Sequence, residues 1–169
     1  MSEASSPPPR SRFGNVVASE SVPLESWGDP SGRVAADSRE IAVALGRKDL
    51  GYCVTSVRAG ARSCPFHFHH GEEEMFFVLE GRGVLRQGDG RGEDEMIDVG
   101  PGDFISFPAG TGIAHQFINP GPGVFTYLAV STVVRTDVAE YPDSDKINIR
   151  STRTILRRTP RLDYFDGES

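Results

Sequence analysis

Residues 65–81, PFHFHHGEEEMFFVLEG, contain three of the four histidines of this 169-residue chain, followed by three consecutive glutamates. Side chains two residues apart in a β-strand face the same side, so His67 and His69 can present both imidazoles to one surface. The pair His70-Gly71 predicts a turn, after which the next strand brings Glu74 back beside the two histidines. The stretch therefore predicts two strands that together carry three metal-ligating side chains.

The fourth histidine, His115, lies in GDFISFPAGTGIAHQFIN at residues 102–119, where proline and glycine predict a rigid turn before a further strand. A single histidine in a strand is usually a hydrogen-bonded structural residue. Three imidazoles and a carboxylate together are different, because an apolar barrel does not readily bury them without a cation. The predicted ligands of one divalent metal ion are His67, His69, Glu74 and His115.

This mixed set of nitrogen and oxygen ligands suits several divalent ions, namely zinc, manganese, iron, cobalt and nickel. The softness of the ligands does not choose among them, and we expect zinc in the protein as purified. Four protein ligands leave room for water or substrate if the ion takes five or six ligands.

Short runs of apolar or alternating residues recur along the chain between turn signals such as GDGRG, GPGD and NPGPG. No sustained helical period appears between Asp49 and Val134. Many short strands at this spacing are typical of an antiparallel sandwich or barrel, so the predicted fold class is all-β. The predicted strands are residues 41–45, 52–57, 75–79, 83–86, 96–99, 104–107, 115–118 and 124–134.

The charge balance argues against polyanionic partners, because 18 Lys and Arg against 24 Asp and Glu give a net charge of -6. No apolar run approaches the length of a membrane span, and the N-terminus lacks a signal-peptide pattern. The two cysteines, Cys53 and Cys64, form no C-x-x-C pair, which favours a reducing compartment. We therefore expect a cytoplasmic protein with neither nucleic-acid nor membrane partners.

The two histidine segments resemble the two sequence motifs of the cupin superfamily, G-x5-H-x-H-x3-4-E-x6-G and G-x5-P-x-G-x2-H-x3-N. The residues that match the first motif are His67, His69, Glu74 and Gly81, with Gly60 one residue too far from His67. The residues that match the second are Gly102, Pro108, Gly110, His115 and Asn119. Four residues rather than two separate Gly110 from His115, a longer turn that also occurs among small cupins.

This resemblance implies a jelly-roll barrel, the double-stranded β-helix, with the metal near its interior and the same four ligands. The chain is similar to a bacterial group of small single-domain metal-binding cupins, which are commonly homodimers, so a homodimer is expected. We predict a flexible tail at residues 1–12 and a single cupin domain at residues 13–169. Its barrel core is expected at about 35–135, followed by a C-terminal extension that adds a strand or wraps the barrel.

Several neighbouring residues have two interpretations. Glu72 and Glu73 are rivals for the carboxylate position, but Glu74 is favoured by strand phase and by its spacing to the glycine that ends the motif. His70 is expected to be exposed, with an alternative role as a ligand or a proton carrier near the mouth. Cys64 is expected to be a small buried apolar residue, with a redox-sensitive role as the alternative.

The resemblance and the ligand set together imply a metal-dependent cupin that binds a small oxygenated molecule in the barrel. Three reaction classes fit: isomerisation or epimerisation of a sugar or keto compound, lyase chemistry, and dioxygenase chemistry. No catalytic residue is identified, since only His70, Glu72 and Glu73 offer a nearby acid or base. The alternative is a non-catalytic module that binds or senses a small molecule and holds a structural metal.

Overall fold

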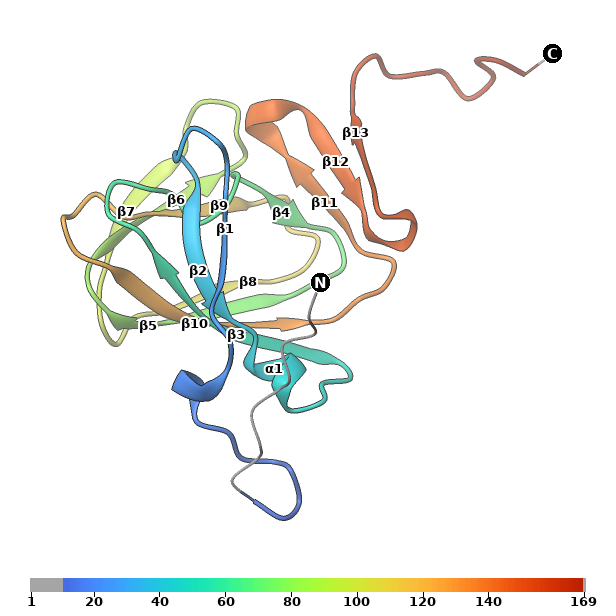
Figure 1. Cartoon of the computed structure of the whole chain (residues 1–169). Coiled ribbons are helices and arrows are strands. Elements are labelled where there is room, and N and C mark those ends of the chain that lie inside the picture. Colours follow the sequence, from blue (N-terminus) through green and yellow to red (C-terminus); the bar gives the residue numbers. More distant parts are fainter. Residues whose placement is uncertain (1–10, 169) are drawn as a thin grey trace.

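Two antiparallel β-sheets pack face to face in the structure, a computed structural model that describes residues 11–168 (Figure 1). The larger sheet has the strand order β1-β2-β3-β10-β5-β8, and the smaller one has the order β7-β6-β9. Their strands are β1 (Glu25–Gly28), β2 (Ala35–Arg39), β3 (Leu50–Val57), β5 (Glu74–Glu80), β6 (Gly83–Gly88), β7 (Glu95–Val99), β8 (Phe104–Phe107), β9 (Ala114–Ile118) and β10 (Phe125–Thr132). The predicted all-β double-stranded β-helix is therefore confirmed.

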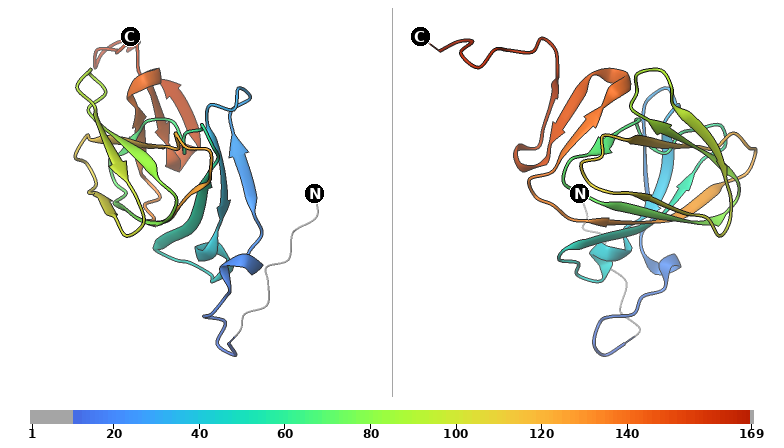
Figure 2. Two further views of the ribbon diagram at one scale, coloured as in Figure 1. Left: turned by 90° about the vertical axis from the view of Figure 1, so that its left-hand side faces the viewer. Right: turned by 180° about the vertical axis from the view of Figure 1, so that it is seen from behind.

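A third sheet, in the order β13-β12-β11-β4, lies beside the barrel. Its strands are β4 (Phe68–His69), β11 (Val138–Tyr141), β12 (Lys146–Ile149) and β13 (Thr154–Arg157). Strand β11 pairs with β4, so the C-terminal extension adds three strands to the segment that carries the histidine pair. Figure 2 shows this sheet against one side of the barrel, with the chain beyond β13 leading away from the body.

The core between the two barrel sheets consists largely of aromatic rings. Phe76 of β5, Phe117 of β9 and Tyr127 of β10 form a triangle with centroid distances of 5.0, 5.6 and 4.8 Å. None of the three side chains is more than 6% exposed. Because residues alternate across β5, Glu74 shares the inward face with Phe76 and Val78 and so lies at the edge of this core.

The predicted strand at residues 41–45 is wrong, because Ile41–Ala44 forms the single helical turn α1. The Ala44 N–H donates to Glu40 O at 3.2 Å and the Leu45 N–H donates to Ile41 O at 3.1 Å. A five-residue apolar run does not distinguish a period of 2 from one of 3.6, and two alanines favour the helix. The seven other predicted runs are strands whose ends agree within two residues.

Strands β1 and β2 were not predicted. The strand predicted to carry the histidine pair appears as β4, and the C-terminal extension adds the three strands β11, β12 and β13. The remaining helical elements of residues 11–168 are 3₁₀ turns at Ser19–Ser21, Pro142–Ser144 and Arg150–Thr152. Within the same residues, no helix is long and apolar enough to cross a membrane. The tail predicted at residues 1–12 falls mostly outside the described residues, and the predicted domain limits stay a prediction.

Two of the residues that match the cupin motifs stabilise turns. Gly81 has a φ of 77°, and a Cβ there would lie 2.2 Å from Val124 O, so only glycine fits. The buried side-chain amide of Asn119 donates to Val57 O at 2.9 Å and to Gly123 O at 2.8 Å. These two motif residues therefore stabilise turns of the barrel.

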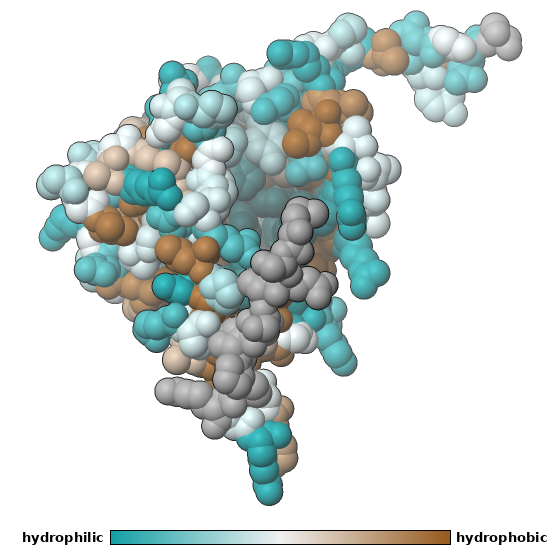
Figure 3. Space-filling view, viewed as in Figure 1, coloured by the Kyte–Doolittle hydropathy of each residue, from teal (hydrophilic) through white to brown (hydrophobic). Residues whose placement is uncertain are grey.

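Hydrophilic residues cover much of the face shown in Figure 3, and hydrophobic residues appear there in several places, over the barrel and over the C-terminal sheet. On β13, Ile155 and Leu156 are both exposed. β13 is the outer strand of its sheet, so its far edge carries no strand partner within the described residues.

We predict that Phe117→Ala lowers the free energy of unfolding by about 3–5 kcal/mol, because it removes a ring packed against three other core rings. Urea denaturation followed by tryptophan fluorescence measures this loss. Phe165→Ala is the matched control: its ring is 71% exposed, and the expected change is within about 0.5 kcal/mol. Equal effects of the two substitutions would contradict the assignment of the core.

Candidate metal centre

A backbone bridge between His67 and His115 brings the two histidine segments together. The His115 N–H donates to His67 O at 2.8 Å, and the His67 N–H donates to His115 O at 3.3 Å. Directly opposed residues of an antiparallel pair project their side chains to the same face. The two imidazole centroids accordingly lie 4.8 Å apart.

His69 and Glu74 complete the group from β4 and the start of β5. The potential ligand atoms of His67, His69 and Glu74 all lie within 4.8 Å of one another. Glu74 Oε2 is 3.6 Å from His69 Nε2 and 3.1 Å from His115 Nε2. The structure thus brings the four residues predicted from the sequence together, with His115 joined to the tighter group of three through Glu74.

Two of the imidazoles are oriented by contacts at Nδ1. His67 Nδ1 lies 2.9 Å from Pro65 O, and because a carbonyl oxygen only accepts, Nδ1 carries the proton and Nε2 keeps its lone pair. His69 Nδ1 lies 2.6 Å from a carboxylate oxygen of Asp137. Both rings are therefore held with Nε2 available to a cation.

Burial and mutual contact determine the charges of Glu74 and His115. Burial alone would raise the pKa of Glu74, but the contact with His115 and the nearby His67 and His69 outweigh it and lower the pKa to about 2. Burial lowers the pKa of His115 to about 4, against the opposing effect of Glu74. Near neutral pH the site therefore presents an ionised carboxylate and a neutral imidazole, the forms that bind metal ions.

The donor set fits a divalent cation. Among the described residues, Glu74 Oε2 is a buried side-chain atom without a hydrogen-bond partner, although His115 Nε2 lies 3.1 Å from it. A buried carboxylate oxygen without a donor is costly, and a metal ion would satisfy it. The three imidazoles and one carboxylate are the ligand types that zinc and similar ions prefer.

The rival carboxylates are otherwise engaged or face solvent. Glu72 is 4% exposed, and its Oε1 accepts from the Val134 N–H at 2.9 Å while its Oε2 accepts from Arg150 at 2.6 Å. Glu73 is exposed. Of the three consecutive glutamates, only Glu74 has a carboxylate oxygen left for a cation among the histidines.

His70 and Cys64 lie close in sequence to the proposed ligands, but neither belongs to the group of four. His70 is nearly half exposed and its Nε2 lies 2.9 Å from Glu140 Oε1, outside the group of four. Burial raises the pKa of Cys64 to about 12, so its thiol stays protonated and is a poor nucleophile. Cys64 is half-buried rather than fully buried, and its Sγ lies 3.3 Å from Ser63 Oγ and 3.6 Å from His67 Nδ1.

Asp137 is the neighbour of the site that sequence reasoning missed. It lies between β10 and β11, is 3% exposed, and contacts His69 across 68 positions of the chain. Its only signal in the sequence is an acidic residue inside the apolar stretch VVRTDVA, and no motif links it to the histidines. The pairing of β11 with β4 places it there.

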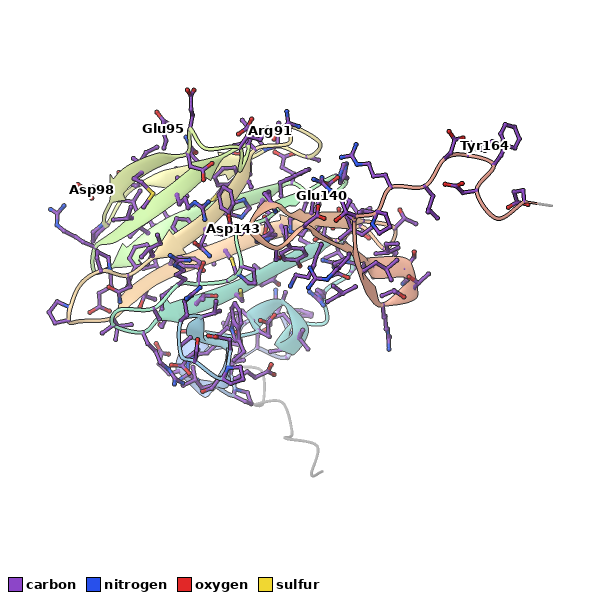
Figure 4. All side chains as sticks on the ribbon, turned by 90° about the horizontal axis from the view of Figure 1, so that it is seen from above. Arg91, Glu95, Asp98, Glu140, Asp143 and Tyr164 are labelled. Atoms are coloured by element: carbon purple, nitrogen blue, oxygen red, sulfur yellow. The ribbon has the colours of Figure 1, made fainter. Side chains whose placement is uncertain are left out.

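The cleft over the site is narrow and does not admit a sphere the size of a water molecule. Its lining includes Phe68, Phe107, Pro108, Thr111 and Ile113. Phe68 also lines a second cavity of about 300 Å³. Its lining includes Arg91 and Glu140, which are labelled in Figure 4. The opposite charges around this cavity are paired, since Arg158 contacts Glu140.

Residues 53–131 match the family model described as Cupin domain, and this range includes all four predicted ligands. The chain also resembles solved structures. One is a candidate sugar phosphate isomerase from Acidithiobacillus ferrooxidans, with a TM-score of 0.79 and 22% identity over 90% of this chain and 98% of that one. Another is a cupin-superfamily sugar phosphate isomerase from Silicibacter pomeroyi, with a TM-score of 0.72 and 27% identity over 87% and 95% of the two chains.

A third similar structure is the polyketide cyclase RemF from Streptomyces resistomycificus, with a TM-score of 0.54 and 25% identity over 69% of this chain and 77% of that one. No curated protein sequence matches the chain. The family match, the jelly-roll topology and these structural likenesses agree with one another. Residues 53–131 therefore form a cupin domain.

Proposed function

We propose that the protein binds one divalent metal ion and isomerises a small phosphorylated sugar or a similar hydroxycarbonyl compound at it. The main support for the metal site is that the buried Oε2 of Glu74 has no hydrogen-bond donor and lies among three imidazoles. The proposed ligands are His67, His69, Glu74 and His115. Zinc is the proposed ion in the protein as purified.

The substrate class rests on the similarity to the Silicibacter pomeroyi sugar phosphate isomerase, which extends over most of both chains. The ion, when bound, supplies a Lewis acid that polarises a carbonyl or hydroxyl oxygen of the substrate. Phe107 stacks on the His115 ring at 4.1 Å and Phe76 lies 5.4 Å from it, so these rings hold the imidazole in place and exclude water. The second cavity that Phe68 lines provides the space for the rest of the substrate.

A second function is favoured by the narrowness of the cleft. An ion closed off by Phe68 and the turn at residues 108–113 would be structural, and the protein would then bind or sense a small molecule without converting it. Metal content alone does not separate the two functions, whereas turnover of a sugar phosphate does.

We expect about one metal ion per chain in the purified protein, measured by elemental mass spectrometry. His67→Ala and His115→Ala should each reduce that content at least about tenfold and lower the Tm, because bound metal stabilises the folded state. His70→Ala is the matched control, since this histidine contacts Glu140 outside the group, and it should keep its metal. Wild-type protein without bound metal, together with folded variants whose Tm equals that of wild type, would contradict the proposed metal site.

The proposed activity predicts that isomerisation of sugar phosphates, followed by NMR, requires metal and is lost on chelation. Glu74→Gln should lower kcat/KM at least about 100-fold, because it weakens the binding of the ion and removes the one negative charge among its proposed ligands. Glu73→Gln, an exposed neighbour with the same change of charge, should behave like wild type. Metal-loaded protein that binds sugar phosphates without converting them would favour the second function.

The burial of His115 predicts a pH dependence of stability in metal-free protein. Its pKa is about 4 in the folded state against an ordinary 6.5, so between about pH 6.5 and 4.5 the unfolded state binds more protons. The free energy of unfolding should therefore fall as the pH is lowered through this range, by at most about 1.4 kcal/mol per pH unit. In urea titrations, His115→Gln should flatten the slope and His70→Gln should not; an unchanged slope in His115→Gln would contradict the prediction.

A further inference from the structure

We propose that Asp137 is a positioning residue for the metal centre: its carboxylate holds the proton of His69 on Nδ1 and so keeps His69 Nε2 free to bind the ion. This inference rests on the proposed metal site. It extends that site to Asp137, just before β11, which lies outside the two motifs and outside the matched residues 53–131.

The geometry is that of a carboxylate and an imidazole held in register by two strands. Asp137 Oδ2 lies 2.6 Å from His69 Nδ1, and both side chains are largely buried. On the other edge of the ring, His69 Nε2 lies 3.6 Å from Glu74 Oε2. The His69 ring is therefore fixed between a carboxylate behind it and the proposed ion site in front of it.

The second oxygen of Asp137 fixes the chain that follows His69. Asp137 Oδ1 accepts from the Gly71 N–H at 2.8 Å and from the Glu72 N–H at 3.2 Å. These bonds close the turn between β4 and β5, the strands that carry His69 and Glu74. One side chain thus sets both the orientation of the imidazole and the path of the turn.

The groups on the Nδ1 side of His69 could themselves be considered a cation site, since His69, Glu72 and Asp137 lie close together. Their oxygens are already satisfied. Both oxygens of Glu72 are engaged by Val134 and Arg150, and Oδ1 of Asp137 accepts two backbone N–H groups. A hydrogen bond from His69 Nδ1 therefore accounts for the remaining oxygen, and the ion belongs at Nε2.

The sharpest test is Asp137→Asn, which keeps the shape of the side chain. Its oxygen can still accept from Gly71 and Glu72, and its amide N–H₂ then faces His69 Nδ1 and donates to it. This reverses the tautomer and places the proton on Nε2, where it blocks the ion. We expect the affinity for zinc, measured by competition with a chelator, to fall about 10–100-fold.

Glu140→Gln is the matched control, because Glu140 also pairs with a histidine, His70, and lies in β11, the strand that follows Asp137. Its zinc affinity should stay within about twofold of wild type. Asp137→Asn protein that is folded and binds zinc as tightly as wild type would overturn the proposal. Equal losses in the two variants would overturn it as well.

Nitrogen NMR of the His69 ring provides a test that needs neither the variant nor any activity. In metal-free wild-type protein at about pH 8 the proton should be on Nδ1, and it should remain there after zinc is added. A proton on Nε2 in the metal-free protein, or loss of the Nδ1 proton on zinc binding, would contradict the proposal. Protein with the expected tautomer that binds no metal would overturn the proposed function and leave the role of Asp137 in orienting His69 intact.

Discussion

The antiparallel bridge between His67 and His115 is the contact on which the centre depends. It consists of two backbone hydrogen bonds, and it joins the edge of β4 to β9 at the one point where both residues are histidine. Because the bond is made by backbone atoms, the side chains emerge on a common face regardless of their chemistry. The other two members of the group lie near this pair: Glu74 is the first residue of β5, and His69 lies in β4.

The surroundings of the bridge are apolar, so burial of the Glu74 carboxylate and the imidazoles there is energetically unfavourable. The His115 ring is stacked on Phe107 and near Phe76, and both phenylalanines belong to the barrel core. Burying a carboxylate and several imidazoles against aromatic rings is unfavourable unless each polar atom finds a partner. Within the described residues Glu74 Oε2 lacks a hydrogen-bond partner, and a cation among the imidazoles would supply one.

The C-terminal sheet has a different part from the barrel. Strands β5 and β9 of the barrel supply Glu74 and His115, and the segment at β4 supplies His67 and His69. The chain after β10 supplies Asp137 and Arg150, which contact His69 and Glu72. Two acids only two residues apart are thereby separated in role: Glu72, in the turn before β5, is paired with Arg150, and Glu74, the first residue of β5, is left facing the histidines. The strand pairing of β11 with β4 is the physical reason that this extension acts on the site.

The sequence by itself determined the fold class, most barrel strands and the set of four side chains, because these depend on local alternation, turn residues and motif spacing. His67 and His69 share a face by strand geometry, and Glu74 follows one turn later. Only the tertiary structure decided that residues 41–45 form a helical turn and that Asp137 contacts His69. Local patterns do not report either feature: a short apolar run fits two periods, and a contact across 68 positions depends on how β11 pairs with β4.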